Sequence, residues 1–328
     1  ENDGAIRVVT LPEKNYTTKP EIYSTKSGLF PADHFYQVYQ DRAGNNWLLT
    51  DNGLGMIRPG ERQPVNYFVE TQGKQDGMNQ AFYAVRECED DICFTSDRGR
   101  IWCYQKKSGE FRLHELPTKA RITSIHAVGN DNTVVTTDSD GFFLSNLKTN
   151  KHIHYSPVTC KELSDQPILS AYVDRTSEVW FEQEEPGVVV HFNPATGVVK
   201  REQMRVEYSN ADRSRPAFHI HEDIHGHVWV HPYGGGFSYF DRERNCLVPF
   251  YDDLGSNNWR FSNKIHAAFS DKQGNLWLCT HSKGLEKVTF RNVPFSMLIP
   301  VPHEYESLSN EVRSVCEDKL GNLWVGLK

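Results

Sequence analysis

The sequence lacks several features that would place it in common functional classes. No stretch of its 328 residues approaches the roughly 18 consecutive apolar residues of a membrane-spanning helix. Lys and Arg are not in excess, because 36 basic against 43 acidic residues leave a net charge of −7, which argues against nucleic-acid binding by this domain. No convincing amphipathic helix and no C-x-x-C metal pattern is present. A membrane span, a nucleic-acid partner and a helical fold are therefore not expected.

Cysteine is present but in an odd number, seven. Five of the seven lie in apolar, strand-like runs, where Cys behaves as a small buried hydrophobe: Cys88, Cys93, Cys103, Cys279 and Cys316. Cys88 and Cys93 could face one another across a tight hairpin. Two interpretations stay open, a disulfide between these two residues or unreactive core thiols, and we favour the thiols. Cysteine usage does not fix the compartment.

One motif, Asp-x-x-Gly-x-x-Trp, recurs along the chain. Its four intact copies carry Asp41, Gly44 and Trp47; Asp223, Gly226 and Trp229; Asp271, Gly274 and Trp277; and Asp318, Gly321 and Trp324. A fifth copy, from Asp174 to Trp180, has Ser177 in place of the glycine, and two degenerate copies place Ile92 and Val134 at the tryptophan position. The seven markers follow one another at intervals of 42 to 49 residues, which is the period of a four-stranded propeller blade.

Each repeat predicts an alternating apolar strand, the Asp-x-x-Gly turn, a second strand that begins near Trp, and two further strands. We therefore predict an all-β fold, a single seven-bladed β-propeller over residues 1–328 with four-stranded antiparallel blades. The blades are centred near Trp47, Ile92, Val134, Trp180, Trp229, Trp277 and Trp324.

The two ends of the chain are predicted to share a blade. The last repeat stops after its second strand, and residues 5–25 contain two strand-like segments before the first repeat. We expect these N-terminal strands to complete the last blade, because a ring has no free edge only when every blade is complete. A chain that stops at Lys328 inside a repeat is also expected to be the first propeller of a longer receptor ectodomain.

The repeated residues are predicted to be structural. Asp in the first position hydrogen-bonds backbone amides of its own turn, and Gly three residues later accepts a positive φ. The Trp is expected to pack flat between neighbouring blades. Any binding chemistry must therefore lie in the loops that break the pattern.

Two segments closely resemble the two-component regulator propeller repeat. The first runs from Ser27-Gly-Leu through Asp41-x-x-Gly-x-x-Trp47 to Gly53-Leu54, and the second from Asp271-x-x-Gly-Asn-Leu-Trp277 to Gly284-Leu285. The resemblance implies a periplasmic sensor domain of a hybrid two-component system of the kind common in gut Bacteroides-type bacteria. Such sensors usually carry two propellers, an Ig-like domain, a membrane span and cytoplasmic kinase, response-regulator and DNA-binding parts.

The resemblance also implies a function. Family members detect oligosaccharides from polysaccharides and switch on the loci that degrade them. This chain would be a non-catalytic ligand-sensing module without cofactor or metal, with a second propeller and a homodimer partner in the full receptor, attached to the inner membrane only through a C-terminal part outside this sequence.

An enzyme is the alternative, either a propeller glycosidase or a polysaccharide lyase. Sialidases carry a turn in which Asp and Gly are two residues apart, whereas here they are three apart in every intact copy. They also need converging arginines and a Tyr–Glu pair. Five loop arginines could in principle converge, and one tyrosine is available for the pair: Arg98, Arg121, Arg215, Arg260, Arg313 and Tyr233. The simpler interpretation is that these arginines form a solvated rim.

Five histidines fall within thirteen residues, from His219 to His231, and invite a zinc hypothesis. They straddle the Asp223 turn, so some belong to opposite ends of a blade. Partly exposed strand histidines are the simpler interpretation, and no metal site is predicted.

A ligand is expected on the face that carries the blade-joining loops and the loops between second and third strands. The opposite face, which carries the Asp-x-x-Gly turns, is strongly acidic, whereas this face is mixed and more aromatic, with Phe30 and Phe82 among its aromatic residues. Aromatic faces stack on sugars while polar groups take their hydroxyls. The predicted contact residues are Tyr233, Trp259, Arg260, His231, His281, Lys283, Arg215, Arg98 and Arg121, and the arginines favour an acidic oligosaccharide weakly. A contact surface for the second propeller or a dimer partner is an equal alternative.

Overall fold

The computed structural model describes residues 6–8, 21–68, 80–129, 131–204, 219–231, 238–249, 265–280, 284–288, 311–319 and 322–327. These residues form β-strands, turns and loops without a helix. They fall into two compact units, Glu1–Arg201 and Glu202–Lys328, which are described separately.

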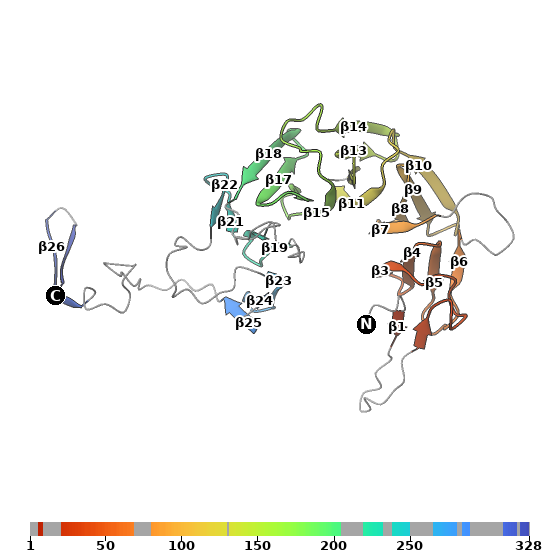
Figure 1. Cartoon of the computed structure of the whole chain (residues 1–328), viewed down its shortest axis with the longest axis horizontal. Coiled ribbons are helices and arrows are strands. Elements are labelled where there is room, and N and C mark those ends of the chain that lie inside the picture. Colours follow the sequence, from red (N-terminus) through yellow and green to blue (C-terminus); the bar gives the residue numbers. More distant parts are fainter. Residues whose placement is uncertain are drawn as a thin grey trace. The chain divides into compact units, whose positions relative to one another are not determined.

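Four antiparallel sheets of four strands begin in the first unit, and each is a meander in chain order (Figure 1). Blade 1 consists of β3 (Phe35–Gln40), β4 (Asn46–Thr50), β5 (Leu54–Ile57) and β6 (Val65–Tyr67). Blade 2 consists of β7 (Phe82–Glu87), β8 (Asp91–Ser96), β9 (Arg100–Gln105) and β10 (Phe111–Glu115). Blade 3 consists of β11 (Ile122–Val128), β12 (Asn132–Thr137), β13 (Phe142–Asn146) and β14 (Lys151–Tyr155). Blade 4 consists of β15 (Ile168–Val173), β16 (Val179–Gln183), β17 (Val188–Asn193) and β18 (Val198–Gln203).

The second unit continues the same pattern. Blade 5 consists of β19 (His219–Glu222), β20 (Val228–His231), β21 (Ser238–Asp241) and β22 (Cys246–Pro249). Among the described residues, blade 6 has β23 (Ile265–Ser270), β24 (Leu276–Thr280) and β25 (Gly284–Val288), and blade 7 has β26 (Val312–Glu317) and β27 (Leu323–Leu327). The all-β propeller class is thus confirmed, and the number of blades agrees with the predicted seven.

The strands at the two ends of the chain pair locally. β1 (Ile6–Val8) pairs with β2 (Glu21–Tyr23), and β26 pairs with β27. The two short sheets belong to different units, so completion of the last blade by the N-terminal strands stays a prediction.

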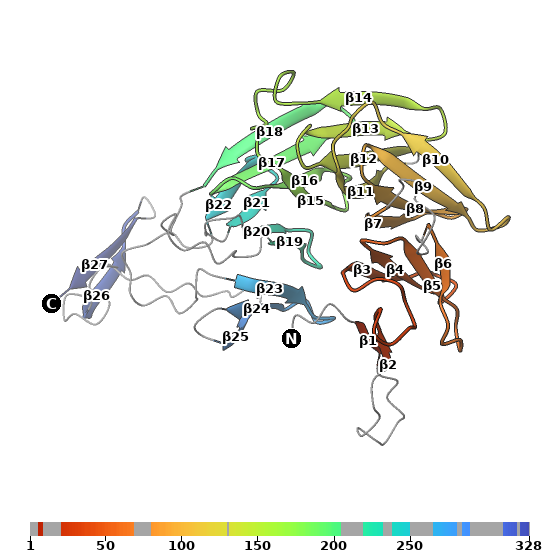
Figure 2. The ribbon, with the colours of Figure 1, turned by 45° about the vertical axis from the view of Figure 1, so that its right-hand side comes forward.

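Burial follows the position of a strand within its blade. In blades 1 to 4 several second and third strands are almost entirely buried: β4, β5, β8, β12 and β17. The fourth strands β10, β14 and β18 contain only half-buried and exposed residues. Figure 2 shows the strands of blades 2 to 4 stacked in order from first to fourth. Middle strands covered on both faces need continuous apolar or β-branched runs, such as Val188-Val-Val in β17.

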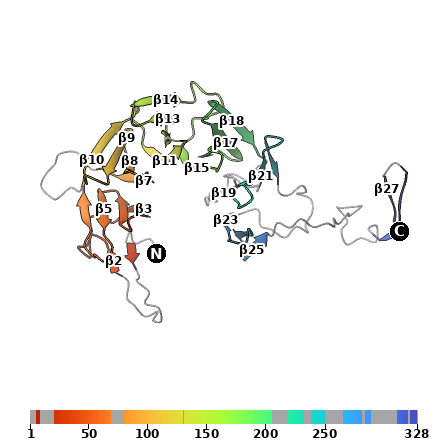
Figure 3. The ribbon, with the colours of Figure 1, turned by 180° about the vertical axis from the view of Figure 1, so that it is seen from behind.

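First strands of consecutive blades lie beside one another. β3 neighbours β7, β7 neighbours β11, and β11 neighbours β15, while β10, β14 and β18 lie on the outside of the first unit (Figure 3). Within the second unit β19 neighbours β23. The starts of successive first strands are therefore brought together although they are forty or more residues apart in sequence.

The hydrophobic core lies between blades. Trp47 and Leu49 of blade 1 pack with Phe82, Ile92 and Phe94 of blade 2 in one buried cluster. Equivalent clusters join blade 2 to blade 3 and blade 3 to blade 4. Trp47 is fully buried with its ring centroid 4.8 Å from Phe94 and 5.1 Å from Tyr104, which confirms the predicted packing of this Trp between blades.

The Asp-x-x-Gly turn has the predicted structure. In blade 1 the Oδ1 atom of Asp41 accepts hydrogen bonds from the backbone N–H groups of Ala43 (3.0 Å) and Asn45 (2.8 Å), and Gly44 has a φ of +86°. Gly226 and Gly274 also have positive φ, and Ser177 takes this conformation in blade 4, whereas Gly321 lies outside the described residues.

A further hydrogen bond, not foreseen from the sequence, links each Asp to the Trp of its own repeat. The indole Nε1–H donates to the second carboxylate oxygen at 2.9 Å for Trp47 and Asp41, 3.0 Å for Trp180 and Asp174, 3.0 Å for Trp229 and Asp223, 2.9 Å for Trp277 and Asp271, and 3.0 Å for Trp324 and Asp318. The carboxylate thus holds both the turn and the first large side chain of the second strand.

Blade 2 corrects the predicted alignment. Gln40 pairs with Asn46 and Tyr39 with Trp47, whereas Glu87 pairs with Ile92 and Arg86 with Cys93. The connection between first and second strands is one residue shorter in blade 2, so Cys93, not Ile92, takes the tryptophan position. Cys93 accordingly packs toward blade 3, while Ile92 packs toward Trp47.

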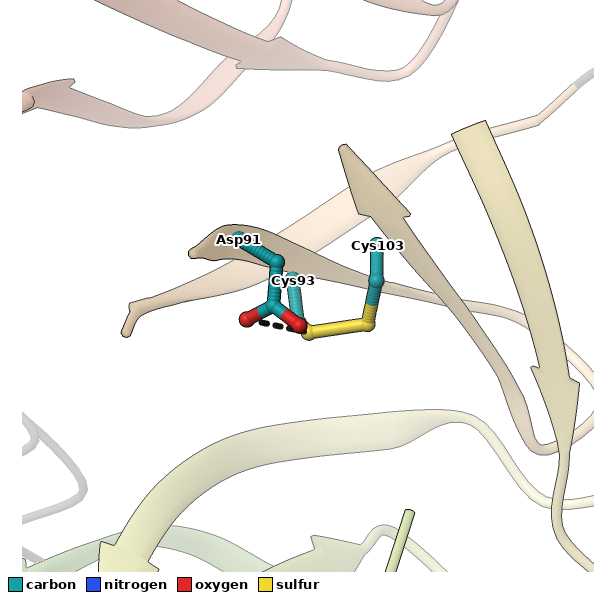
Figure 4. Close-up of side chains that lie close together, drawn as sticks. All are labelled: Asp91, Cys93 and Cys103. Carbon is teal, nitrogen blue, oxygen red and sulfur yellow. Dashed lines mark hydrogen bonds between the residues drawn. A yellow bond between two sulfur atoms is a disulfide. The ribbon is translucent and has the colours of Figure 1, made fainter. Parts of the chain in front are cut away.

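The cysteine predictions also need correction. Cys93 forms a disulfide with Cys103, which lies directly opposite it on β9 (Figure 4). Cys88 is a free thiol, because its predicted partner Cys93 lies opposite Arg86 on the neighbouring strand and is bonded to Cys103. Cys279 and Cys316 are exposed within their own sheets. On β24 the alternating side chains place Leu276 and Leu278 on the covered face and Cys279 on the other.

Candidate ligand-binding face

Each blade has a turn end, where the Asp-x-x-Gly turn lies, and a loop end. The loop end carries the start of the first strand and the connection between the second and third strands. Because first strands of neighbouring blades lie side by side, residues at their starts meet at the loop end. The residues that gather at the loop ends of blades 1 to 3 form the candidate face.

Two tyrosines lie at the centre of this face. Tyr36 is the second residue of β3 and Tyr83 the second residue of β7, and their ring centroids are 4.8 Å apart. Tyr36 is 41% exposed, and His34 packs edge-on against it at 4.7 Å. This aromatic platform, Tyr36 and Tyr83, is therefore open to a ligand on one side.

Arg121 joins the platform from blade 3. Its guanidinium carbon lies 5.1 Å from the centroid of the Tyr83 ring, in cation–π geometry. Its Nε atom lies 3.4 Å from Oδ2 of Asp138, and its backbone N–H donates to Oδ1 of the same residue at 3.2 Å. Arg121 is thus held from two sides, with its side chain still 44% exposed.

Acidic residues occupy one equivalent position in four consecutive blades, directly after the second strand: Asp51, Asp97, Asp138 and Glu184. The backbone N–H of Asp51 bonds to the carbonyl of His34 at 3.2 Å, that of Asp138 to Arg121 at 3.1 Å, and that of Glu184 to Pro167 at 2.9 Å. Each of these bonds fixes the acid beside the residue that precedes the first strand of the same blade.

The tyrosine hydroxyls stay protonated in this setting. Tyr83 bonds to both carboxylate oxygens of Asp97 at 3.1 Å. Burial, followed by the charge of Asp97 and the hydrogen bond to it, raises the pKa of Tyr83 far above its ordinary value. Burial and the nearby charge of Asp51 also raise the pKa of Tyr36, although Arg121 opposes this. Both phenols are therefore neutral hydrogen-bonding groups over the physiological range.

The predicted contact residues fare differently. Arg98 and Arg121 are exposed at the loop ends of blades 2 and 3, and Arg98 has a φ of +58°. His231 is fully buried at the end of β20, a second strand covered on both faces, which does not fit a ligand contact. Phe30 and Phe82 are also buried, in core clusters. The remaining predicted contacts lie outside the described residues: Tyr233, Trp259, Arg260, His281, Lys283 and Arg215.

The histidine segment has protein partners. His221 Nε2 lies 2.6 Å from Oγ of Ser270, and His227 Nδ1 lies 2.9 Å from Oδ2 of Asp223. Over the ranges that the structure describes, the one grouping with metal-ligand proximity is Asp91, Cys93 and Cys103. Its two sulfurs form the disulfide shown in Figure 4, so they do not offer thiolates to a metal.

Sequence reasoning missed Tyr36, Tyr83 and the aspartates of this face. One signal was available, because Phe-Tyr opens the first strand in both blade 1 and blade 2. In each pair the Phe turns toward a core cluster and the Tyr toward the loop end. The contact of Arg121 with Tyr83 has no local signal, since the two residues belong to different blades.

The fold and repeats can be compared with known proteins. The sequence profile of the two-component regulator propeller matches residues 260–282 and 307–328. No protein of curated function matches the sequence significantly. The chain is thus a β-propeller. Within it, residues 260–282 and 307–328 match the two-component regulator propeller repeat, and the first of these segments overlaps the second one on which the sequence resemblance was based.

Solved structures share this fold at low sequence identity. The extracellular domain of a hybrid two-component system from B. thetaiotaomicron superposes with a TM-score of 0.55 and 18% identity, over 91% of this chain and 39% of that one. Virginiamycin B lyase from Staphylococcus aureus superposes with a TM-score of 0.53 and 13% identity, over 89% of this chain and 91% of the lyase. The WD40 β-propeller domain of Doa1 superposes with a TM-score of 0.53 and 9% identity, over 89% of this chain and 88% of that domain. The similarity to each is one of fold, and this chain spans 39% of the length of the first.

Among the described residues, no helix is long and apolar enough to cross a membrane.

Proposed function

We propose that this chain is the extracytoplasmic, periplasmic sensing module of a hybrid two-component sensor. In this proposal it recognises an oligosaccharide derived from a polysaccharide and regulates the genes for its use. The observation that carries the proposal is the match of its repeats to the two-component regulator propeller. The shared fold of an extracellular domain from a hybrid two-component system supports it.

The disulfide supports the proposed compartment. Cys93 and Cys103 are each 1% exposed and bonded to one another. Structural disulfides persist in oxidising compartments such as the bacterial periplasm and are rare in the cytosol.

The loop ends of blades 1 to 3 support the proposed ligand class. An exposed aromatic platform beside fixed carboxylates and a guanidinium is the kind of surface that binds sugars, since rings stack and hydroxyls take hydrogen bonds. Binding would signal by favouring one arrangement of this domain against a second propeller or a homodimer partner, because a ligand shifts an equilibrium only by its differential affinity. The membrane would be reached through a C-terminal part of the receptor.

The alternative is a glycosidase or lyase, because a lyase shares the fold over most of both chains. One experiment separates the two. The purified chain is screened against a glycan array, and each bound oligosaccharide is then incubated with it at high protein concentration. Binding without new reducing or unsaturated ends is expected. Release of such ends would establish the enzyme, and absence of binding across the array would overturn oligosaccharide recognition by this chain.

A further inference from the structure

We propose that Tyr36 and Tyr83 form the stacking platform of a saccharide subsite that accepts an uncharged sugar ring. This inference rests on the proposed function and adds to it the location of the subsite and the class of sugar. It differs from the weak sequence-based preference for an acidic ligand.

The platform has the shape that stacking requires. The two rings are 4.8 Å apart with an interplanar angle of 54°, so they form a shallow angled surface and not a closed stack. Tyr36 exposes 41% of its surface, so one side of the platform is open to solvent. The C–H face of a pyranose ring can cover this apolar area, while the hydroxyls at the ring edge reach polar neighbours.

The polar neighbours are held in place before a ligand arrives. The hydroxyl of Tyr83 fixes the Asp97 carboxylate at 3.1 Å. Asp138 and the Tyr83 ring fix Arg121 from two sides. Carboxylates accept and guanidinium groups donate, so the pair matches the donor and acceptor functions of sugar hydroxyls. Little side-chain freedom remains to be lost on binding, which favours affinity.

The charge at the face disfavours an anionic sugar. The charged groups that act on the two tyrosines are the carboxylates of Asp51 and Asp97 and the single guanidinium of Arg121. Arg121 is already paired with Asp138, which leaves its charge largely compensated. A uronate or sulfate would meet net repulsion at short range, whereas a neutral ring has no such cost.

The test uses the whole chain and calorimetric titration with matched neutral and uronic-acid-containing oligosaccharides taken from the array hits. We expect Tyr36→Ala to weaken binding of the neutral oligosaccharide at least tenfold and Tyr36→Phe to retain it. Val38→Ala is the matched control, because Val38 is 50% exposed on the same strand but lies nearer the turn end. Thermal unfolding of each variant shows that the fold is kept.

Salt dependence gives a second readout. Affinity for a neutral ligand should stay within twofold between low and molar salt, whereas an ion-paired ligand would weaken steeply. Unchanged affinity in Tyr36→Ala would overturn the subsite while leaving oligosaccharide sensing intact. Preferential, salt-sensitive binding of the acidic oligosaccharide would overturn the sugar class. Failure to bind any oligosaccharide would instead overturn the proposed function.

Discussion

Blades 1 and 2 anchor the first core residue of the second strand with different chemistry. In blade 1 the first core residue of the second strand is Trp47, whose indole N–H is held by Asp41. In blade 2 this position holds Cys93, which is bonded covalently to Cys103 on the third strand. Both arrangements fix the turn end of the sheet where it packs against the next blade.

The difference follows from the length of one connection. Five residues, 41–45, join the paired residues Gln40 and Asn46 in blade 1, and this length accommodates the Asp-x-x-Gly turn. Only 88–91 join Glu87 and Ile92 in blade 2, so no carboxylate is placed to reach an indole six residues later. A cross-strand disulfide needs no such turn, because it requires only that two Cys lie opposite one another. Each blade therefore has its turn end fixed, in blade 1 by a hydrogen bond and in blade 2 by a disulfide.

Removing Trp47 should produce the largest loss. Trp47→Ala leaves a cavity against Phe94 and Tyr104 and deprives Asp41 of its indole donor. We expect the free energy of unfolding to fall by about 3–5 kcal/mol, measured by urea denaturation. Trp47→Phe should lose clearly less, because it keeps most of the buried ring. A loss below about 1 kcal/mol for Trp47→Ala would show that the Trp does not hold blades 1 and 2 together.

Removing the disulfide should lower the free energy of unfolding somewhat less than removing Trp47. The two cysteines are 10 residues apart, and the entropy of closing such a loop in the unfolded chain corresponds to roughly 3 kcal/mol. We expect the double variant Cys93→Ala/Cys103→Ala to lose about this amount in urea denaturation, and reductant to reproduce the effect in the wild type. Cys88→Ala, which removes a free thiol of the same blade, is the control. Equal stability of the oxidised and reduced wild type would contradict a stabilising bond.

These two blades also show how far the sequence can be interpreted. The positions of Asp41, Gly44 and Trp47 are predictable because a turn of defined hydrogen bonding imposes a fixed spacing. The pairing of Cys93 with Cys103 is not predictable from the sequence. The choice between Cys88 and Cys103 depends on the register of the strands, which shifts when the connection between first and second strands changes by one residue. The platform of Tyr36, Tyr83 and Arg121 joins three blades, and such contacts arise from packing between blades, which local patterns do not encode.

Acid should weaken the turn of blade 1 through Asp41, whereas blade 2 has no Asp at the equivalent position. The buried Glu87 of blade 2 also has a lowered pKa, because hydrogen bonds from Lys106 and Tyr39 outweigh the effect of burial, but its bond to Tyr39 links it to blade 1 as well. Burial alone would raise the pKa of Asp41, but hydrogen bonds from Trp47 and Asn45 outweigh it and hold the pKa below the ordinary value. Hydrogen bonds from Trp277 and Asn275 lower the pKa of Asp271 to about 2. A lowered folded-state pKa gives stability that is present above the unfolded pKa and is lost as pH falls through the folded one. The loss should therefore occur below about pH 4.

Asp41→Asn tests this effect directly. The amide keeps one acceptor oxygen but turns an N–H₂ group toward donors, so we expect a loss of about 1–3 kcal/mol at neutral pH. Below about pH 4 the gap between variant and wild type should narrow, because the wild-type carboxylate becomes protonated. Hydrogen exchange measured by mass spectrometry should place the acid-induced loss in β3 and β4 more than in β8 and β9. Equal acid sensitivity of the two strand pairs would remove the distinction between the blades.

The smallest effect concerns the glycine position of the turn. Blade 4 carries Ser177 there at a φ of +65°, with the same backbone bond, Ser177 N–H to Asp174 C=O at 2.9 Å, that Gly44 makes to Asp41. A left-handed conformation costs a residue with a Cβ roughly 1–2 kcal/mol, whereas glycine adds about 0.5–1 kcal/mol of unfolded-state entropy. Ser177→Gly should therefore stabilise the protein by about 0.5–1 kcal/mol. Gly44→Ala should do the reverse, since its new Cβ would also lie 3.2 Å from Cγ of Pro59. Urea midpoints that move in the same direction for both variants would mean that the turn does not require the left-handed conformation.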